Sequence, residues 1–330
     1  HIPVNSEILK IDHIPVLEYI KDSVYPYIAA ATPQWKFDKS VLELFSGRPG
    51  STVNITYKTP EGKIKEVGMT RNYYTSGSTE EMVNAGKPPI EIKILEDGIG
   101  YIKLSSFMGM YIDTINQVFT NNLPQLQKCE GLIIDIRGNR GGTDMAWENI
   151  AFHLIPDSTF DMDVKCFSRI HIACYKNWGK NSTHPKLMEY NRGLAMTEVE
   201  HGLYKNTVDD AEKLNQPLVV ISGQHVASAA EDFLLLMKNR KRGVIVGEPS
   251  VGCMSEPTIF PIMDGLEVMI CVKTCVGLDG FQPNDGGIMP DVLVKAGCES
   301  YLQGNDNILQ KGIEELRMRM WILPVESLLE

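Results

Sequence analysis

The stretch Val219-Val-Ile-Ser-Gly-Gln-His-Val-Ala-Ser-Ala-Ala-Glu-Asp-Phe233 joins an apolar run to an amphipathic one. The run Pro217–Ser222 is short and rich in β-branched residues, which predicts a buried strand. The segment Ser228–Asn239 has apolar residues at helical spacing, and Glu231 follows Ser228 by three residues. A Ser and a Glu at this spacing form the capping box of a helix N-terminus. We therefore predict a strand, a short turn and a helix that begins at Ser228.

The hydroxyl of Ser228 has two interpretations that share one geometry. The first is structural, since a serine at this position caps the helix. The second is chemical, since the first turn of a helix offers free N–H groups and the positive end of the helix dipole. Those groups can hold an oxyanion when the hydroxyl attacks a carbonyl. The stretch alone leaves both interpretations open.

A Gly-rich stretch, Asp135-Ile-Arg-Gly-Asn-Arg-Gly-Gly142, follows the apolar run Gly131–Ile136. Glycines let the backbone turn sharply and approach a ligand closely. Neither of the common phosphate-binding patterns, G-x-x-x-x-G-K-[ST] and G-x-G-x-x-G, is present, so a phosphate loop is excluded. The stretch is either a plain strand-to-helix turn or a loop that faces a ligand.

Strands alternate with helices from Ile90 onward, which implies an α/β layered core. Residues 1–73 are instead β-rich with one helix, and the polar residues 74–89 predict a linker. The expected strands are Ile8–Ile11, Ser51–Tyr57, Lys63–Met69, Gly98–Leu104, Gly131–Ile136, Pro217–Ser222, Gly243–Gly247, Thr258–Ile262 and Leu266–Cys275. The expected helices are Pro15–Val24, Tyr111–Leu126, Asp144–Leu154, Ser228–Asn239 and Ile308–Met318.

Composition excludes several classes of protein. The 330 residues include 32 basic and 42 acidic ones, which gives a net charge of −10. This acidic balance argues against a nucleic-acid-binding protein, because such proteins usually carry a basic surface. Apolar runs such as Phe233–Met237 fall far short of the roughly 18 residues of a membrane span. The seven cysteines form no C-x-x-C pair and no H-E-x-x-H is present, so we expect neither a metal site nor a cofactor. We expect most of the cysteines to be small core residues.

The motifs of this chain, in their order, resemble those of the C-terminal processing peptidases (tail-specific proteases) and of the tricorn protease core. They are the strand Gly98–Leu104, the D-x-R-x-N-x-G-G loop, the A-S-A-A-E helix start, Val246-Gly-Glu248 and Gly287-Ile-Met-Pro-Asp291. The resemblance implies a crotonase-like ββα peptidase core over residues 90–296, followed by a C-terminal helical segment, 297–330. Residues 1–73 look like the later part of a PDZ-type domain.

The resemblance also assigns roles to single residues. Ser228 matches the family's nucleophile, and the N–H of Ala229 matches one donor of the oxyanion hole. The second donor falls in the Gly pair of the Gly-rich loop, and we expect it to be Gly141. Three positions of the same loop are expected to brace the turn rather than to react: Asp135, Arg137 and Asn139.

The general base is where this sequence departs from the family. Tail-specific proteases carry a lysine 25 residues after the serine, and here that position is Cys253. The tricorn branch uses Ser, His and Glu; its acid position is Asn284, with Asp285 beside it, and either side chain can orient an imidazole. The histidine of that branch lies upstream of the PDZ-like segment, so we expect the base outside residues 1–330. His225 is the local alternative for the base.

The resemblance implies a serine endopeptidase, a hydrolase that cleaves unfolded or C-terminal protein segments through an acyl-enzyme. One alternative is a non-catalytic member of the superfamily that binds a peptide or an apolar ligand, and another is a crotonase-type acyl-CoA enzyme. The expected partner is a protein or peptide substrate, with neither nucleic acid nor a membrane span, and a homo-oligomer is allowed. Members of the family with PDZ-like domains are commonly extracytoplasmic, so the resemblance implies an extracytoplasmic localisation for this chain. It would be periplasmic, or membrane-associated through a segment before His1.

Overall fold

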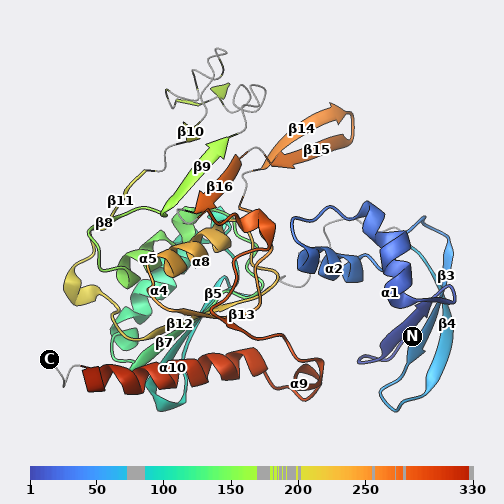
Figure 1. Cartoon of the computed structure of the whole chain (residues 1–330), viewed down its shortest axis with the longest axis horizontal. Coiled ribbons are helices and arrows are strands. Elements are labelled where there is room, and N and C mark those ends of the chain that lie inside the picture. Colours follow the sequence, from blue (N-terminus) through green and yellow to red (C-terminus); the bar gives the residue numbers. More distant parts are fainter. Residues whose placement is uncertain are drawn as a thin grey trace. The chain divides into compact units, whose positions relative to one another are not determined.

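The computed structural model describes residues 1–72, 86–168, 202–254, 257–271, 273–277 and 280–326, with isolated positions between 179 and 199. The chain divides into two compact units, shown in Figure 1. The first comprises His1–Lys87 and Gly297–Asn305, and the second comprises Pro88–Ala296 and Asp306–Glu330. The predicted linker 74–89 lies mostly outside the described residues.

The first unit is built on a four-stranded antiparallel sheet in the order β2-β1-β3-β4. Its elements are β1 (Glu7–Ile11), β2 (Ile14–Pro15), α1 (Val16–Tyr19), α2 (Pro33–Leu42), β3 (Thr52–Lys58), β4 (Ile64–Thr70) and α9 (Cys298–Leu302). The predicted hairpin is confirmed as β3 and β4, which are joined through Gly62 at a φ of 81°. The predicted helix Pro15–Val24 is α1 followed by a π-helical turn, Ile20–Val24.

The second unit is built on a six-stranded sheet in the order β17-β13-β12-β7-β6-β5. The strands are β5 (Ile90–Ile94), β6 (Ile99–Leu104), β7 (Gly131–Asp135), β12 (Leu218–Ser222), β13 (Val244–Gly247) and β17 (Val292–Leu293). All neighbouring pairs are parallel except β5 and β6. The predicted α/β core is therefore confirmed as a mixed, mostly parallel sheet.

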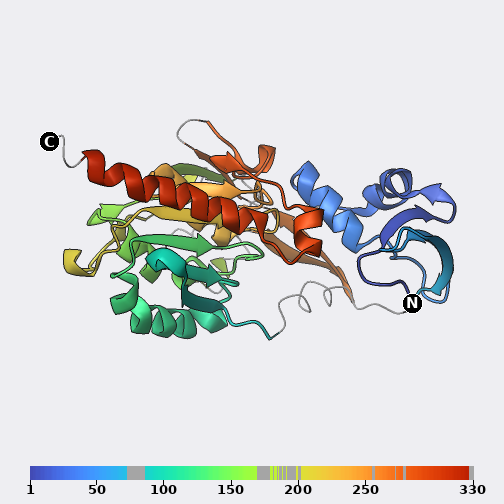
Figure 2. The ribbon, with the colours of Figure 1, turned by 90° about the horizontal axis from the view of Figure 1, so that it is seen from below.

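Helices cover both faces of this sheet (Figure 2). One face packs against α4 (Ile112–Leu126), α5 (Glu148–Leu154) and α8 (Ala229–Asn239), and the other packs against α10 (Asn307–Glu326). Successive side chains of a strand point to opposite faces, so Val220 joins the first cluster while Val219 and Ile221 join the second. Burial on both faces explains why β12 is apolar throughout.

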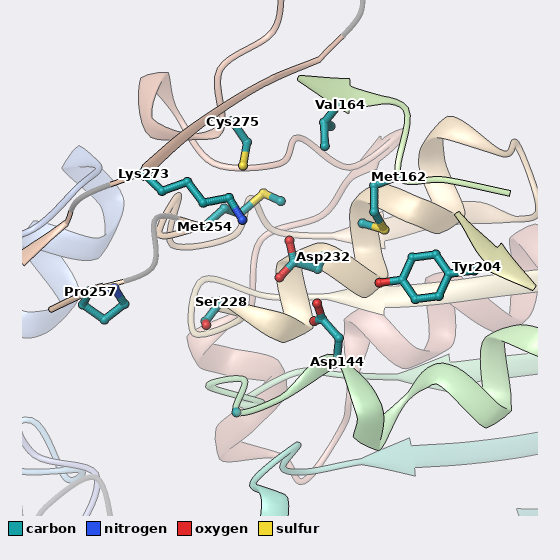
Figure 3. A pocket seen from close by; sticks show the side chains of 11 residues that line it. Asp144, Met162, Val164, Tyr204, Ser228, Asp232, Met254, Pro257, Lys273 and Cys275 are labelled. Carbon is teal, nitrogen blue, oxygen red and sulfur yellow. The ribbon is translucent and has the colours of Figure 1, made fainter. Parts of the chain in front are cut away.

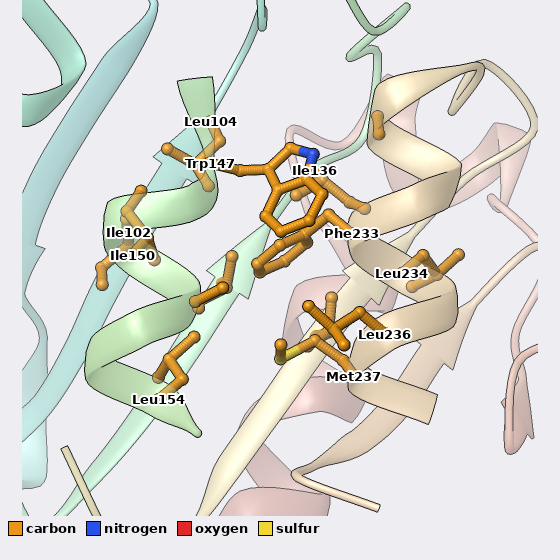
Figure 4. Close-up of a cluster of buried hydrophobic side chains, with 14 of the residues drawn as sticks. Ile102, Leu104, Ile136, Trp147, Ile150, Leu154, Phe233, Leu234, Leu236 and Met237 are labelled. Atoms are coloured by element: carbon orange, nitrogen blue, oxygen red, sulfur yellow. The ribbon is translucent and has the colours of Figure 1, made fainter. Parts of the chain in front are cut away.

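Aromatic side chains fill the space between α5 and α8 (Figure 4). Trp147 and Phe233 are fully buried, and their ring centroids lie 6.0 Å apart. The predicted helix Asp144–Leu154 is divided into a 3-10 turn, Asp144–Ala146, and α5. This packing fixes α8 on the sheet, and with it the position of Ser228.

Smaller sheets lie beyond the ends of the main strands. They contain β8 (Thr159–Phe160) with β11 (Tyr204–Lys205), β14 (Pro257–Met263) with β15 (Leu266–Cys271), and β10 (Glu198–Val199), β9 (Val164–Ser168) and β16 (Lys273–Gly277). The prediction of a single strand over Leu266–Cys275 is wrong. Its first part pairs with β14, whereas its last residues belong to β16 and pair with β9.

Two cysteines form a disulfide, because Cys166 of β9 and Cys275 of β16 are register partners. They are 109 residues apart in the chain. Among the other described cysteines, Cys129 is buried, while Cys271 and Cys298 are exposed. Cys166 and Cys275 are buried as well, so three of the six described cysteines lie in the core, while Cys253 is half-buried. The expectation that most cysteines are small core residues stays a prediction, since Cys174 lies outside the described residues. Within the described part of the chain, no helix has the length and apolar character needed to cross a membrane.

Candidate active site

The candidate site lies where two neighbouring parallel strands end. The Gly-rich loop follows β7, and the turn to Ser228 follows β12. These strands pair in parallel, with Ile221 opposite Asp135. The carboxyl ends of adjacent parallel strands open on one edge of a sheet, which is where α/β proteins commonly bind ligands. The two stretches that the sequence singled out therefore meet.

Ser228 lies in a sharp turn between β12 and α8. Its backbone has a φ of 56° and a ψ of −132°, which is a rare conformation for a residue other than glycine. Strained backbone of this kind is frequent at functional sites. A serine in such a strand-to-helix turn presents its hydroxyl away from the sheet. Ser228 is half-buried at the N-terminus of α8, where the helix dipole favours negative charge.

Glu231 holds this turn in place. Its carboxylate is fully buried and accepts four hydrogen bonds, from the Ser228 N–H (3.0 Å), the Ser250 hydroxyl (2.5 Å), the Gly252 N–H (2.6 Å) and the Cys253 N–H (2.8 Å). Burial raises the pKa of Glu231, and the four hydrogen bonds counteract that rise only in part. The residue is thus more than a helix cap, because it ties α8 to the loop 250–253.

The Gly-rich loop lies directly against the nucleophile candidate. A Cβ on Gly141 would come within 2.6 Å of the Ala227 carbonyl oxygen and 2.8 Å of the Ser228 Cβ. The φ of Gly141 is 88°, so glycine is required for conformation as well as for space. The Gly141 N–H donates to the Asn139 side-chain oxygen at 2.9 Å. Its role as an oxyanion donor stays a prediction, and Gly142 of the same pair lines the adjacent pocket.

Asp135, Arg137 and Asn139 brace the loop, as predicted. The fully buried Asp135 carboxylate accepts from the Tyr101 hydroxyl at 2.7 Å and from the Arg137 guanidinium at 2.6 Å. Arg137 also donates to Asp306, just before α10, at 2.7 Å. Burial lowers the pKa of Arg137, but the two carboxylates outweigh it and raise the pKa overall. None of the three residues is among those that line the pocket.

A pocket of about 390 Å³ opens beside Ser228 (Figure 3). It is lined by Gly142, Asp144, Met162, Val164, Tyr204, Ser228, Asp232, Met254, Pro257, Lys273 and Cys275. Figure 3 shows the Asp144 and Asp232 carboxylates, the Tyr204 hydroxyl and the Lys273 amine directed into one space. Burial, with the charges of Asp144, Glu148 and Asp232, raises the pKa of Tyr204.

Sequence reasoning did not identify the polar residues of this pocket. Asp232 follows Glu231 directly, so its place in the first turn of α8 was a usable signal. Lys273 lies on β16, and its place in the wall of this pocket depends on the pairing of β16 with β9. Nothing local in the sequence indicates that pairing. The lysine is therefore a new member of the site.

The other predicted residues are less central. Cys253 does lie beside the nucleophile candidate, because the Ser228 N–H donates to its carbonyl at 3.2 Å. Burial, with neighbouring Cys271 and Glu231, raises the pKa of the Cys253 thiol to about 11. His225 is half-buried and Asp285 is exposed, and neither is among the pocket-lining residues. The side chain of Asn284 lies outside the described residues.

A thiol with this raised pKa is protonated at neutral pH. The position at which tail-specific proteases carry a lysine is therefore a neutral thiol in this chain. Within the described ranges, no group of His, Cys, Asp and Glu is arranged to hold a metal ion.

A serine at a strained strand-to-helix turn, next to a Gly-rich loop and a pocket, is the arrangement of a serine hydrolase. The chain belongs to peptidase family S41, whose model matches residues 98–294. It is 26% identical over 259 residues to the chloroplastic C-terminal processing peptidase of Tetradesmus obliquus, covering 76% of this chain and 48% of the relative. It is 24% identical over 272 residues to a carboxyl-terminal-processing protease of Picosynechococcus, covering 80% and 54%. The chain thus spans about half the length of these curated relatives.

Solved structures share the fold. Mature CPAF superimposes with a TM-score of 0.64 at 15% identity, covering 91% of this chain and 74% of CPAF. A peptidase structure from Parabacteroides merdae, described as putative, gives a TM-score of 0.51 at 17% identity, covering 90% and 87%. The resemblance to the tail-specific peptidases is confirmed at the level of family, and the mixed α/β fold is the one these structures share.

Proposed function

We propose that this chain is the peptidase portion of a serine endopeptidase that cleaves unfolded or C-terminal protein segments. The observation that carries the proposal is the position of Ser228, in a strained turn at the N-terminus of α8 and on the wall of the pocket. Membership of family S41 supports peptide-bond hydrolysis as the reaction. The proposal includes a crotonase-like core and a PDZ-like first unit that recruits substrate by strand addition.

In this mechanism the Ser228 Oγ attacks the scissile carbonyl carbon, and its proton passes to a general base. The carbonyl π bond becomes a lone pair on oxygen, which the Ala229 N–H and one N–H of the Gly141–Gly142 pair stabilise. The C–N bond then breaks, and the leaving amine takes the proton from the base. Water, activated by the same base, hydrolyses the acyl-enzyme and restores the serine.

The base itself is proposed to come from outside residues 1–330. Cys253 holds the position of the family's lysine, and its raised pKa leaves little thiolate at neutral pH to take up a proton. If that base is a histidine, Asp285 and Asn284 are proposed to orient its imidazole. His225 remains the local alternative for the base. Lys273 is a further candidate, because it lines the same pocket as Ser228.

An extracytoplasmic place is proposed for the chain. The Cys166–Cys275 disulfide favours an oxidising compartment, because thiols are kept reduced in the cytosol. A relative whose name describes it as chloroplastic also supports a place outside the cytosol. The protein is expressed in an oxidising and in a reducing compartment, and its free thiols are counted. The assignment predicts that the Cys166–Cys275 disulfide forms in the oxidising compartment.

The activity test compares residues 1–330 with the full-length product on an unfolded protein substrate. The full-length protein is expected to cleave it and to be insensitive to chelators, and residues 1–330 alone are expected to show a large deficit. Lys273→Met is assayed in both. Equal turnover by both forms that is lost in Lys273→Met would assign the base to Lys273 and overturn the outside base. Absence of cleavage in both, with retained peptide binding, would favour the non-catalytic alternative.

A further inference from the structure

The hairpin of β14 and β15 presents an apolar surface that the main core does not use. Seven of its apolar side chains are between 38% and 66% exposed: Ile259, Ile262, Met263, Leu266, Val268, Met269 and Ile270. We name these residues the apolar hairpin. Isolated two-stranded hairpins are marginally stable in water, and apolar side chains gathered at a surface commonly mark a binding site. The hairpin is therefore a candidate binding surface.

The backbone of the hairpin is also available for pairing. Among the described strands, β14 and β15 pair only with each other. The outer edge of β15 offers backbone N–H and C=O groups that another extended chain can bind, whereas Pro257 and Pro261 remove two N–H donors from β14. The charged residues of the two strands and their turn are few, namely Asp264 and Glu267. An apolar, extended peptide matches both the side chains and the edges.

The hairpin continues the wall of the pocket beside Ser228. Pro257, the first residue of β14, lines the pocket, as does Met254 before it in the chain. Lys273 and Cys275 of β16, the strand after β15, line it as well. In Figure 1 the hairpin projects beyond β16, away from the six-stranded sheet. A polypeptide with its scissile bond at Ser228 that extends along this wall passes onto the hairpin.

We propose that the apolar hairpin is a docking surface for an extended, apolar segment of the polypeptide substrate. The inference rests on the proposed function and names its substrate class, unfolded segments rich in apolar residues. Strand addition supplies main-chain hydrogen bonds, and the exposed side chains supply apolar contact. A folded protein hides both its backbone edges and its apolar side chains, so the hairpin selects unfolded chains.

Binding, rather than cleavage, tests this proposal. Fluorescently labelled α-lactalbumin, permanently unfolded by reduction and carboxamidomethylation, is titrated with the Ser228→Ala protein, and native α-lactalbumin serves as the folded probe. The test variant adds Ile259→Glu and Met269→Glu, which are directly opposite each other on the two strands. The matched control adds Ile94→Glu and Met318→Glu, two exposed apolar side chains elsewhere in the same unit.

The test variant is expected to bind unfolded α-lactalbumin about tenfold more weakly or worse, with the control unchanged and native α-lactalbumin unbound. Unchanged affinity in the test variant would overturn the proposal. The proposal would also be overturned if sedimentation showed a wild-type dimer and a monomeric variant while the affinity for unfolded α-lactalbumin stayed the same. In that case a second copy of the chain would occupy the hairpin. If the double variant unfolds, Met263→Glu at the hairpin tip replaces it.

The outcome is separable from the peptidase proposal. Hairpin-dependent binding by a full-length protein that cleaves nothing would retain the docking surface and reject the hydrolase. Cleavage of unfolded α-lactalbumin at the same rate by the wild type and the Met263→Glu variant, with the same affinity, would retain the hydrolase and reject the docking surface.

Discussion

The two walls of the pocket are built in different ways. The inner wall, which includes Gly142 and Ser228 and is backed by Gly141, consists of loops at the ends of buried parallel strands. Buried hydrogen bonds to Glu231 and Asn139 hold it. The outer wall, formed by Val164, Lys273 and Cys275, lies on a small sheet closed by a disulfide. The proposed function thus assigns the chemistry to the buried inner wall and substrate contact to the outer wall.

This difference has an energetic basis. Where polar groups are buried, removing one hydrogen-bond partner lowers the free energy of unfolding, because the remaining group is buried without its hydrogen bond. A peripheral sheet opens locally at a lower free-energy cost, because water can replace its lost hydrogen bonds. Binding surfaces commonly lie in such less stable regions. Changes to the inner wall should therefore have larger effects than changes to the outer wall.

The largest effect is expected for Glu231→Ala. The substitution removes the acceptor of four hydrogen bonds, and breaking a buried charged network typically costs about 3–5 kcal/mol. Urea unfolding measures the loss. Glu267→Ala on the exposed strand β15 is the matched control and should change little. A similar, small loss in both variants would remove Glu231 from its structural role.

The next effect is on rate and concerns Gly141→Ala. The added Cβ would meet the Ala227 carbonyl and Ser228, and disturbing one oxyanion donor typically lowers kcat by about 10²–10³. Gly138→Ala is the control, because Gly138 has a φ of 79° with open space around it. It shares the backbone strain without the clash. Steady-state cleavage by the full-length protein should fall steeply only in Gly141→Ala.

Removal of the disulfide tests the outer wall. Replacing Cys166 and Cys275 with alanine is expected to lower the free energy of unfolding by about 2–4 kcal/mol, since the two strands lose their crosslink. Cys298→Ala, which removes an exposed free thiol, is the control. Turnover of a short peptide should fall less than in Gly141→Ala. A greater loss of turnover than in that variant would contradict the division between the walls.

The smallest effect is a pH dependence. Burial raises the pKa of Asp306, but the hydrogen bond from Arg137 and other contacts lower it overall below its ordinary value. A carboxyl with a lowered folded-state pKa adds stability above its unfolded pKa and loses it as the pH falls through the folded pKa. Urea midpoints should therefore drop on acidification below about pH 4, and less steeply in Asp306→Asn. Parallel curves for the two proteins would contradict this assignment.

The inner wall could be predicted from sequence because its signals are local. An apolar strand, Ser228 and Glu231 lie within a short stretch, and the Gly-rich loop has its own composition. The outer wall could not, because Lys273 and the Cys166–Cys275 pair depend on strand register between distant segments. Glu231 was predicted as a cap, but its bonds to the loop 250–253 come from tertiary packing.

The most direct test of the central claim is covalent labelling of the full-length protein with a fluorophosphonate, followed by peptide mass spectrometry. Such probes report a serine hydroxyl that is activated as a nucleophile. The account predicts one adduct, on Ser228, and its complete loss in Ser228→Ala. Equal labelling of the Ser228→Ala protein, or an adduct on another serine, would contradict Ser228 as the nucleophile.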